Sequence, residues 1–237
     1  KKHKVCTLRP QGKEIVRTWL YYTLLRCYQL TQGAIFNDAW IHYHVVDEKG
    51  KKMSKSVGNV IDPHEILDKY GAETFRFWCA IEGNLAETDF RCSFARIEGA
   101  AKTLTKLWNV AKFVSQFTPL PKATLTDTDK WIMQETSELV KYTKESYEKY
   151  DFHLPATKIK HFIWETFASH YIELVKTRAY NHDNKFTKEE QNSAIFTLNY
   201  CLDSILKLLA PIIPMMTYKI YKDSRKKDIQ AEKFPET

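Results

Sequence analysis

The sequence predicts a mostly helical α+β fold, in which the end of an α/β layer precedes an antiparallel helical bundle. Two observations lead to it. Near residue 45 a β-branched and aromatic run is followed by a turn and a capped helix, and from about residue 93 apolar residues recur at spacings of three and four. A content of 43% hydrophobic and 14% aromatic residues suffices to bury a core and excludes a disordered chain.

The first elements are a helix and a strand. Residues 12–28 are rich in apolar and aromatic side chains and nearly free of breakers, which predicts a helix buried along one side. Residues 39–46, AWIHYHVV, predict a short strand. The letters DEKG then predict a turn, in which Gly50 can adopt a positive φ.

A loop rich in lysine, serine and glycine follows, KKMSKSVGNV, called loop 51–60 below. The next helix has clear boundary signals: Asp62 as N-cap, Pro63 at the first helical position, Glu65 three residues after the cap, and Gly71 at the end. We therefore expect loop 51–60 to be fixed at both ends and free to move in its middle.

Long helical periods fill the remainder. The three clearest apolar stripes are Ile97, Ala101, Leu104, Trp108 and Ala111; Ile159, Ile163, Phe167, Tyr171 and Leu174; and Ile195, Leu198, Leu202, Ile205 and Leu209. With a weaker stripe over 131–150, they predict about four antiparallel helices separated by residues 118–128, 151–155 and 181–184. Two prolines within 210–216 predict a bend, and residues 223–237 a tail that is frayed or docked on a missing part. The expected domains are 1–90, 91–222 and this tail.

Charge and cysteines limit the possible function. The whole formal charge of +7 resides in residues 1–60, which favours a phosphate-bearing partner, with a solubilising surface as the alternative. No apolar run suits a membrane span or signal peptide, so we expect a cytoplasmic protein. Five dispersed cysteines without a C-x-x-C pair predict neither zinc site nor disulfides. Because the chain begins at Lys1 rather than methionine, we expect a segment of a longer protein.

Loop 51–60 has the composition of a phosphate-binding loop. Lys52 and Lys55 can both reach the oxygens of one polyphosphate, and Ser54, Ser56 and backbone N–H groups add donors. If the bond between the α- and β-phosphates of ATP breaks, such donors meet the growing negative charge and lower the barrier. On composition alone a solvated turn is the alternative, since neither a G-x-x-x-x-G-K-[ST] nor a G-x-G-x-x-G motif is present.

Several stretches resemble one enzyme family. KMSKS (52–56), with GNVIDP (58–63) and YGAETFRFW (70–78), resembles the second signature of the class I aminoacyl-tRNA synthetases. LRPQGKEIVRTWLYYTLLR (8–26) is similar to the valyl branch of that family. KLWNVAKF, DKWI, FASHYIELVKTRAY and LLAPIIP resemble the helical anticodon-binding domain of this branch in its archaeal or eukaryote-like style.

The resemblance implies a function and its partners. It implies the C-terminal remnant of a Rossmann-like nucleotide-binding layer with a KMSKS loop, followed by an anticodon-binding bundle. The parent enzyme would be a monomeric ligase that joins valine to tRNA(Val) through valyl-adenylate. It would use ATP with Mg²⁺ as counter-ion, without a protein-bound metal or a membrane.

The resemblance also assigns residues to the ATP site. Lys52 and Lys55 would stabilise the triphosphate and the departing pyrophosphate, beside Ser54 and Ser56. Gly12 would allow close approach of the adenosine, and Glu14 would accept hydrogen bonds from the ribose; an exposed first-turn carboxylate is the alternative for Glu14. His42 matches a histidine that precedes the loop in the family, although Tyr43 replaces the usual glycine.

For RNA, the end of the helix near residue 180 is the main candidate: Lys176, Arg178, Tyr180 and His182, with a solvated helix end as the alternative. Trp131 and Trp164 are weaker candidates, because large aromatic side chains are mostly buried in cores.

One absence limits the expected activity. The family's other signature, of the H-I-G-H type, does not occur, and there is no room for the amino-acid pocket or the editing domain. We therefore expect half an ATP site, inactive alone. The alternatives are a segment of an isoleucyl enzyme and a freestanding RNA-binding protein descended from a synthetase.

Overall fold

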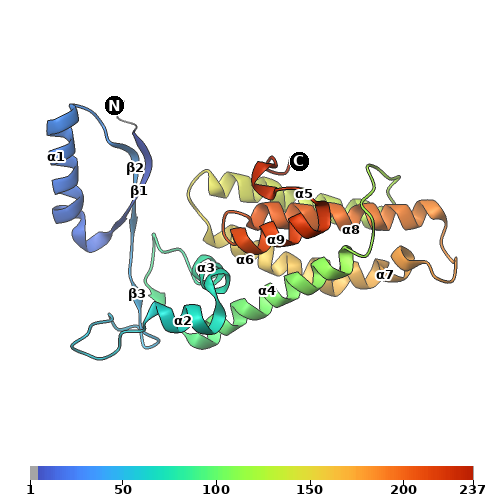
Figure 1. The fold of residues 1–237 in the computed structure, drawn as a ribbon, viewed down its shortest axis with the longest axis horizontal. Coiled ribbons are helices and arrows are strands. Elements are labelled where there is room, and N and C mark those ends of the chain that lie inside the picture. The colour runs from blue at the N-terminus through green and yellow to red at the C-terminus, as the bar shows by residue number, and fades with distance from the viewer. Residues whose placement is uncertain (1–4, 237) are drawn as a thin grey trace. The chain divides into compact units, whose positions relative to one another are not determined.

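A computed structural model describes residues 5–236 of the chain, so the ends of the expected first domain and tail, residues 1–4 and 237, lie outside the described residues. The chain forms two compact units (Figure 1). The N-terminal unit comprises Lys1–Asp62 and Glu82–Ser93, and the helical unit comprises Pro63–Ile81 and Phe94–Thr237.

The N-terminal unit is built around a parallel strand pair. Strands β1 (Cys6–Gly12) and β2 (Phe36–His42) pair with Gly12 opposite His42. Parallel neighbours need a crossover connection, which α1 (Tyr21–Thr31) supplies. A 3-10 turn (Lys13–Ile15) and a π-helical turn (Val16–Leu20) join β1 to α1. Glu14 therefore lies in the first turn after the carboxyl end of β1.

The helix expected over residues 12–28 is wrong in its start and in its burial. Its first residue, Gly12, ends a strand, and no residue of α1 is buried. The Trp19 side chain just before α1 is 60% exposed. A two-stranded pair is too narrow to cover an amphipathic helix, so the apolar periodicity does not lead to burial among the described residues.

The strand expected over residues 39–46 is divided in two. After β2 the backbone N–H of Tyr43 donates to the carbonyl of Leu85 at 2.8 Å, which interrupts the pairing. The short β3 (Val45–Val46) then pairs in parallel with β4 (Phe90–Arg91). This second sheet brings the segment around residue 89 beside the start of loop 51–60, because Val46 also bridges to Lys52.

The helical unit is a bundle with α8 at its centre. Its helices are α2 (Pro63–Tyr70), α3 (Ala72–Ile81), α4 (Phe94–Val114), α5 (Asp127–Tyr147), α6 (His153–His161), α7 (Glu173–Tyr180), α8 (Lys188–Leu209) and α9 (Pro214–Arg225). A π-type segment, Phe162–Ile172, makes α6 and α7 continuous, and a 3-10 turn, Ile229–Ala231, follows α9. Helix α8 contacts α4, α5, α6, α7 and α9.

The predicted boundaries of the helix after loop 51–60 agree with the structure. Helix α2 begins at Pro63 and ends before Gly71, which has φ of 79° and donates its N–H to the carbonyl of Leu67. The proline bend is also confirmed, since α8 ends at Leu209 and α9 begins at Pro214.

Most of the predicted stripes form the core, with a few exceptions. Leu198, Leu202, Ile205 and Leu209 are fully buried. Leu174 is 66% exposed, and Val175 is buried in its place. The π-type hydrogen bonding upstream shifts the angular phase of the helix. A stripe continued at 3.6 residues per turn therefore falls on Leu174, one residue before the side chain that is buried. Trp108 and Trp131 are also exposed rather than core.

The first residues of the expected tail are held on the bundle and do not form a frayed end. The guanidinium of Arg225 lies 2.8 Å from the Asp203 carboxylate of α8, and the Ile229 side chain is buried. This part of the tail docks on the bundle itself, because a half-buried ion pair and an apolar side chain hold it there. All five cysteines are free thiols. None of the helices within residues 5–236 has the length and apolarity that crossing a membrane requires.

Candidate functional site

Loop 51–60 is fixed at both ends by one carboxylate and one amide. The Asp47 carboxylate accepts from the backbone N–H of Lys51 at 2.7 Å and from the Asn59 side chain at 2.8 Å. The Asn59 amide oxygen accepts the N–H of Ser54 at 2.9 Å. These donors lower the pKa of Asp47, the Asn59 amide contributing most. The loop is thus closed at its base by groups that sequence reasoning did not single out.

The two lysines of the loop differ in their surroundings. The Lys52 ammonium lies 2.8 Å from both carboxylate oxygens of Glu14, which is 38 residues away in sequence. The Lys55 side chain is exposed, and no polar partner is found for it among the described residues. The hydroxyl oxygens of Ser54 and Ser56 lie 3.1 Å apart within the loop. Lys55 is therefore available to an incoming anion, whereas Lys52 must first leave Glu14.

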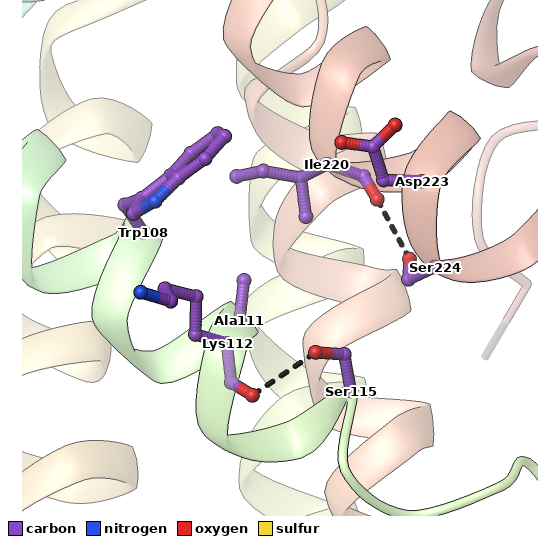
Figure 2. Close-up of a pocket in the computed structure, with 7 residues that line it drawn as sticks. All are labelled: Trp108, Ala111, Lys112, Ser115, Ile220, Asp223 and Ser224. Carbon is purple, nitrogen blue, oxygen red and sulfur yellow. Dashed lines mark hydrogen bonds between the residues drawn. The ribbon is translucent and has the colours of Figure 1, made fainter.

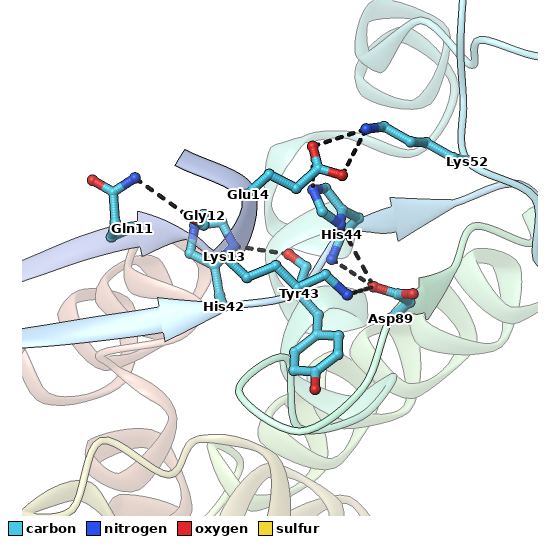
Figure 3. Close-up of polar contacts among 9 residues, drawn as sticks. All are labelled: Gln11, Gly12, Lys13, Glu14, His42, Tyr43, His44, Lys52 and Asp89. Atoms are coloured by element: carbon cyan, nitrogen blue, oxygen red, sulfur yellow. Dashed lines mark hydrogen bonds and ion pairs between the residues drawn. The ribbon is translucent and has the colours of Figure 1, made fainter. Parts of the chain in front are cut away.

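Glu14 is the centre of a charged cluster (Figure 3). The hydrogen bond from Lys52 lowers the pKa of Glu14 most, and the charges of His44, Lys52 and Lys13 add to this. The His44 Nε2 atom lies 3.4 Å from Glu14. Asp89 accepts the backbone N–H of His44 at 2.8 Å, which is the main reason that the pKa of Asp89 is lowered.

The other two predicted residues lie on the neighbouring strands. Gly12 and His42 are opposite each other on β1 and β2, and a Cβ on Gly12 would lie 3.9 Å from the His42 ring. The His42 Nδ1 atom is 2.9 Å from the Tyr43 carbonyl oxygen, and its ring lies near Trp40. Gly12, Glu14, His42 and Lys52 thus come together within one unit, from three separate segments.

Four residues of this site were missed: His44, Asp47, Asn59 and Asp89. Asp47 begins the predicted turn and Asn59 lies within the quoted loop, so their polarity was a usable local signal. Asp89 joins the site only through the pairing of β4 with β3, for which the sequence offers no local pattern.

In the helical unit, the structure contradicts one of the predicted RNA contacts. Arg178 is only 9% exposed, and its guanidinium lies 2.6 Å from both Asp129 and the Thr126 hydroxyl. The Asp129 carboxylate is fully buried and also accepts from Tyr171 and Ser193. A buried, paired guanidinium has a structural role, because exposing it to RNA would leave Asp129 uncompensated.

The other predicted contacts surround the end of α7. The Tyr180 and His182 rings are stacked, with centroids 5.2 Å apart, and Tyr180 donates to Gln116 at 2.8 Å. Lys176 is exposed and paired with Glu173 of the same helix. A hollow of about 370 Å³ runs along this end, lined by Lys176, Thr177, Tyr180, Asn181, His182, Asp183, Lys185 and Phe186.

A smaller pocket of about 180 Å³ lies between α4 and α9 (Figure 2). Trp108 and Ile220 form apolar walls, and Lys112 and Asp223 carry opposite charges. The two serines that line the pocket both donate hydrogen bonds to nearby backbone carbonyls, Ser115 to that of Lys112 and Ser224 to that of Ile220.

Trp164, which lies elsewhere on the bundle, is half-buried and donates to Thr103 at 3.1 Å. Within residues 5–236, no cluster of three or more His, Cys, Asp or Glu side chains is arranged to hold a metal ion.

Comparisons with known proteins find matches to two protein families along the chain. Residues 3–91 match the family "tRNA synthetases class I (I, L, M and V)", and residues 129–237 match "Anticodon-binding domain of tRNA ligase". Two solved structures share the fold. The first is the LeuRS–tRNA–LeuAMS complex of Agrobacterium radiobacter, with a TM-score of 0.76 and 17% identity, covering 97% of this chain and 28% of that chain. The second is Mycobacterium tuberculosis methionyl-tRNA synthetase with methionyl-adenylate, with a TM-score of 0.68 and 20% identity, covering 91% of this chain and 43% of that chain. The chain belongs to the class I aminoacyl-tRNA synthetases.

Within that class its relatives are valine–tRNA ligases. The chain is 44% identical to the enzyme of Pyrobaculum aerophilum over 226 residues, 95% of this chain and 28% of the relative. It is 42% identical to the enzyme of Aeropyrum pernix over 234 residues, 97% of this chain and 28% of the relative. The chain spans about 28% of the length of these relatives.

Proposed function

We propose that the chain is the part of a valyl-tRNA synthetase that carries the KMSKS half of the ATP site and the anticodon-binding bundle. The complete enzyme joins valine to tRNA(Val) with ATP, through valyl-adenylate. The observation that carries this proposal is the convergence of Lys52, Glu14, Gly12 and His42 at the carboxyl ends of β1 and β2. Ligands of parallel α/β sheets bind at this edge.

The residues of the site fit a nucleoside triphosphate by their chemistry. Lysine ammonium groups suit phosphate oxygens, because they are point charges on flexible stems that can follow a moving charge. Lys55 and Lys52 would meet the triphosphate and the leaving pyrophosphate, with Ser54 and Ser56 as further donors. The Glu14 carboxylate would accept from ribose hydroxyls, beside Gly12 and His42. The nucleotide would bring Mg²⁺ as its counter-ion.

In the helical unit we assign the RNA contact to the end of α7. Lys176 is exposed there beside the stacked rings of Tyr180 and His182, which suits phosphate contact and base stacking. Arg178 acts only indirectly, by fixing α7 to Asp129. The exposed Trp131 is a second stacking candidate on α5. We infer that the chain alone forms no adenylate, because it lacks the family's first signature. A monomeric, cytoplasmic parent enzyme is part of the same proposal.

Lys55→Ala in the complete synthetase tests the ATP-site assignment. Removing one transition-state donor should slow ATP–pyrophosphate exchange by about 100-fold or more, while the KM for ATP changes little. Lys49→Ala is the matched control, because it removes an exposed lysine from the turn before the loop. An unchanged exchange rate in Lys55→Ala would refute the role of this lysine and, with it, the assignment of loop 51–60.

A further inference from the structure

The Lys52 ammonium cannot pair with the Glu14 carboxylate and with a nucleotide phosphate at the same time. In the structure it donates to both oxygens of Glu14, and its side chain is 63% exposed. If it moves to a nucleotide phosphate, Glu14 loses its nearest cation while it must still face the ribose. An exposed carboxylate on a short turn would then rotate freely or be repelled by the phosphates. A second group must therefore hold the Glu14 carboxylate in place.

His44 is the group placed to do so. Its Nε2 atom is 3.4 Å from Glu14, and its Nδ1 atom is 3.8 Å from Asp89 on the opposite side. Figure 3 shows the imidazole between the two carboxylates. The residue cannot easily shift, because its backbone N–H donates to Asp89 at 2.8 Å.

Asp89 is itself held in place. The Lys13 ammonium lies 3.5 Å from its carboxylate and 3.7 Å from the centre of the Tyr43 ring. The charged groups facing His44 are therefore Glu14 and Asp89, with Lys52 and Lys13 behind them. The two ring nitrogens of His44 thus face different carboxylates, and an imidazole N–H can donate to a carboxylate oxygen.

We propose that His44, anchored by Asp89, is a positioning residue that holds the Glu14 carboxylate at the nucleotide site when Lys52 leaves it for the phosphates. The inference rests on the proposed ATP site. Neither residue touches the reacting phosphates, so their effect is on nucleotide binding rather than on the chemical step. In the nucleotide-bound state Glu14 exchanges a lysine partner for a histidine partner.

Kinetics of the complete synthetase in ATP–pyrophosphate exchange test this role. His44→Ala should raise the KM for ATP by about five- to tenfold, because the contact that holds the Glu14 carboxylate is lost, and should change kcat by less than about twofold. His44→Gln should recover most of the affinity, since its amide N–H can donate to Glu14.

Asp89 offers a second, independent variant. Asp89→Ala should also raise the KM for ATP, and the double variant with His44→Ala should be no worse than the more impaired single variant, because the two act as one unit. His161→Gln removes an exposed histidine of the helical unit and is the matched control.

The possible outcomes separate the two proposals. If Lys55→Ala abolishes exchange but His44→Ala keeps the wild-type KM, the positioning role is wrong and the ATP site stands. If His44→Ala and His44→Gln lose kcat and KM equally, the role is structural and the inference fails. If Lys55→Ala leaves exchange unchanged, the ATP-site proposal itself fails.

Discussion

At the scale of single residues, the buried charge of Asp129 has the largest predicted effect on stability. It accepts from Arg178, Tyr171 and Ser193 inside the bundle, and burial together with this carboxylate raises the pKa of Tyr171. The Tyr171 phenol therefore remains protonated and able to donate. The cluster ties α5 to α7 and α8 near the candidate RNA surface.

We expect Asp129→Ala to lower the free energy of unfolding by about 3–5 kcal/mol, because it leaves a buried guanidinium unpaired. Urea denaturation followed by circular dichroism measures this. Glu138→Ala, an exposed change on the same helix, should stay within about 0.5 kcal/mol. Equal stability of the two variants would show that Arg178 finds another partner.

The base of loop 51–60 should be sensitive to acid. The folded-state pKa of Asp47 is lowered, so its contribution to stability is complete above its unfolded value and is lost as the pH falls through the folded value. The N–H of Ser54, held by Asn59, should keep its hydrogen-exchange protection from about pH 5 to 8 and lose it only as the pH falls below the ordinary aspartate pKa of about 3.9. Protection that persists in Asp47→Asn at neutral pH would contradict this.

At the scale of elements, two local signals decide where helices begin and end. Thr187 and Glu190 form a reciprocal capping box at the start of α8, with the Glu190 N–H donating to the Thr187 hydroxyl at 3.2 Å. Thr187→Ala should cost about 1 kcal/mol of stability in urea denaturation, and Thr187→Ser should cost little, since serine caps equally well. A cost equal in both variants would indicate lost packing rather than a lost cap.

Gly71 ends α2 for a conformational reason. Its φ of 79° is unfavourable for side chains, while a Cβ there would meet nothing within 4 Å. Gly71→Ala should therefore destabilise the chain by about 1 kcal/mol through backbone strain alone. Gly99→Ala on α4 also has open space but no positive φ, and should be neutral or stabilising by urea denaturation. The opposite order would contradict the strain argument.

At the scale of the whole molecule, charge and the end of α7 predict how tRNA binds. The excess positive charge lies in residues 1–60, and phosphate contacts make affinity fall steeply with salt. Filter binding of tRNA to the 237-residue chain should therefore weaken sharply as salt rises. Absence of binding at low salt would contradict the RNA-binding proposal.

Two variants separate the contributions of phosphate contact and base stacking to the affinity for tRNA. Lys176→Ala should reduce the slope of log affinity against log salt by about one, the share of one phosphate contact. Tyr180→Ala should weaken binding by about 1–3 kcal/mol without changing the slope, because stacking releases no counter-ions. Tyr218→Ala, a similarly half-buried tyrosine on α9, is the control. A slope change in the Tyr180 variant would argue against stacking.

The sequence by itself determined the features that depend on neighbouring residues: the start and stop of α2, the proline bend after α8, and most of the bundle core. Local geometry and periodicity suffice for these, because the interacting groups lie within a few turns. It could not determine that Lys52 meets Glu14, that Asp89 supports His44, or that Arg178 is buried on Asp129. Each of these pairs joins residues more than 35 positions apart. Only the path of the folded chain brings such groups together and decides which charges are removed from water.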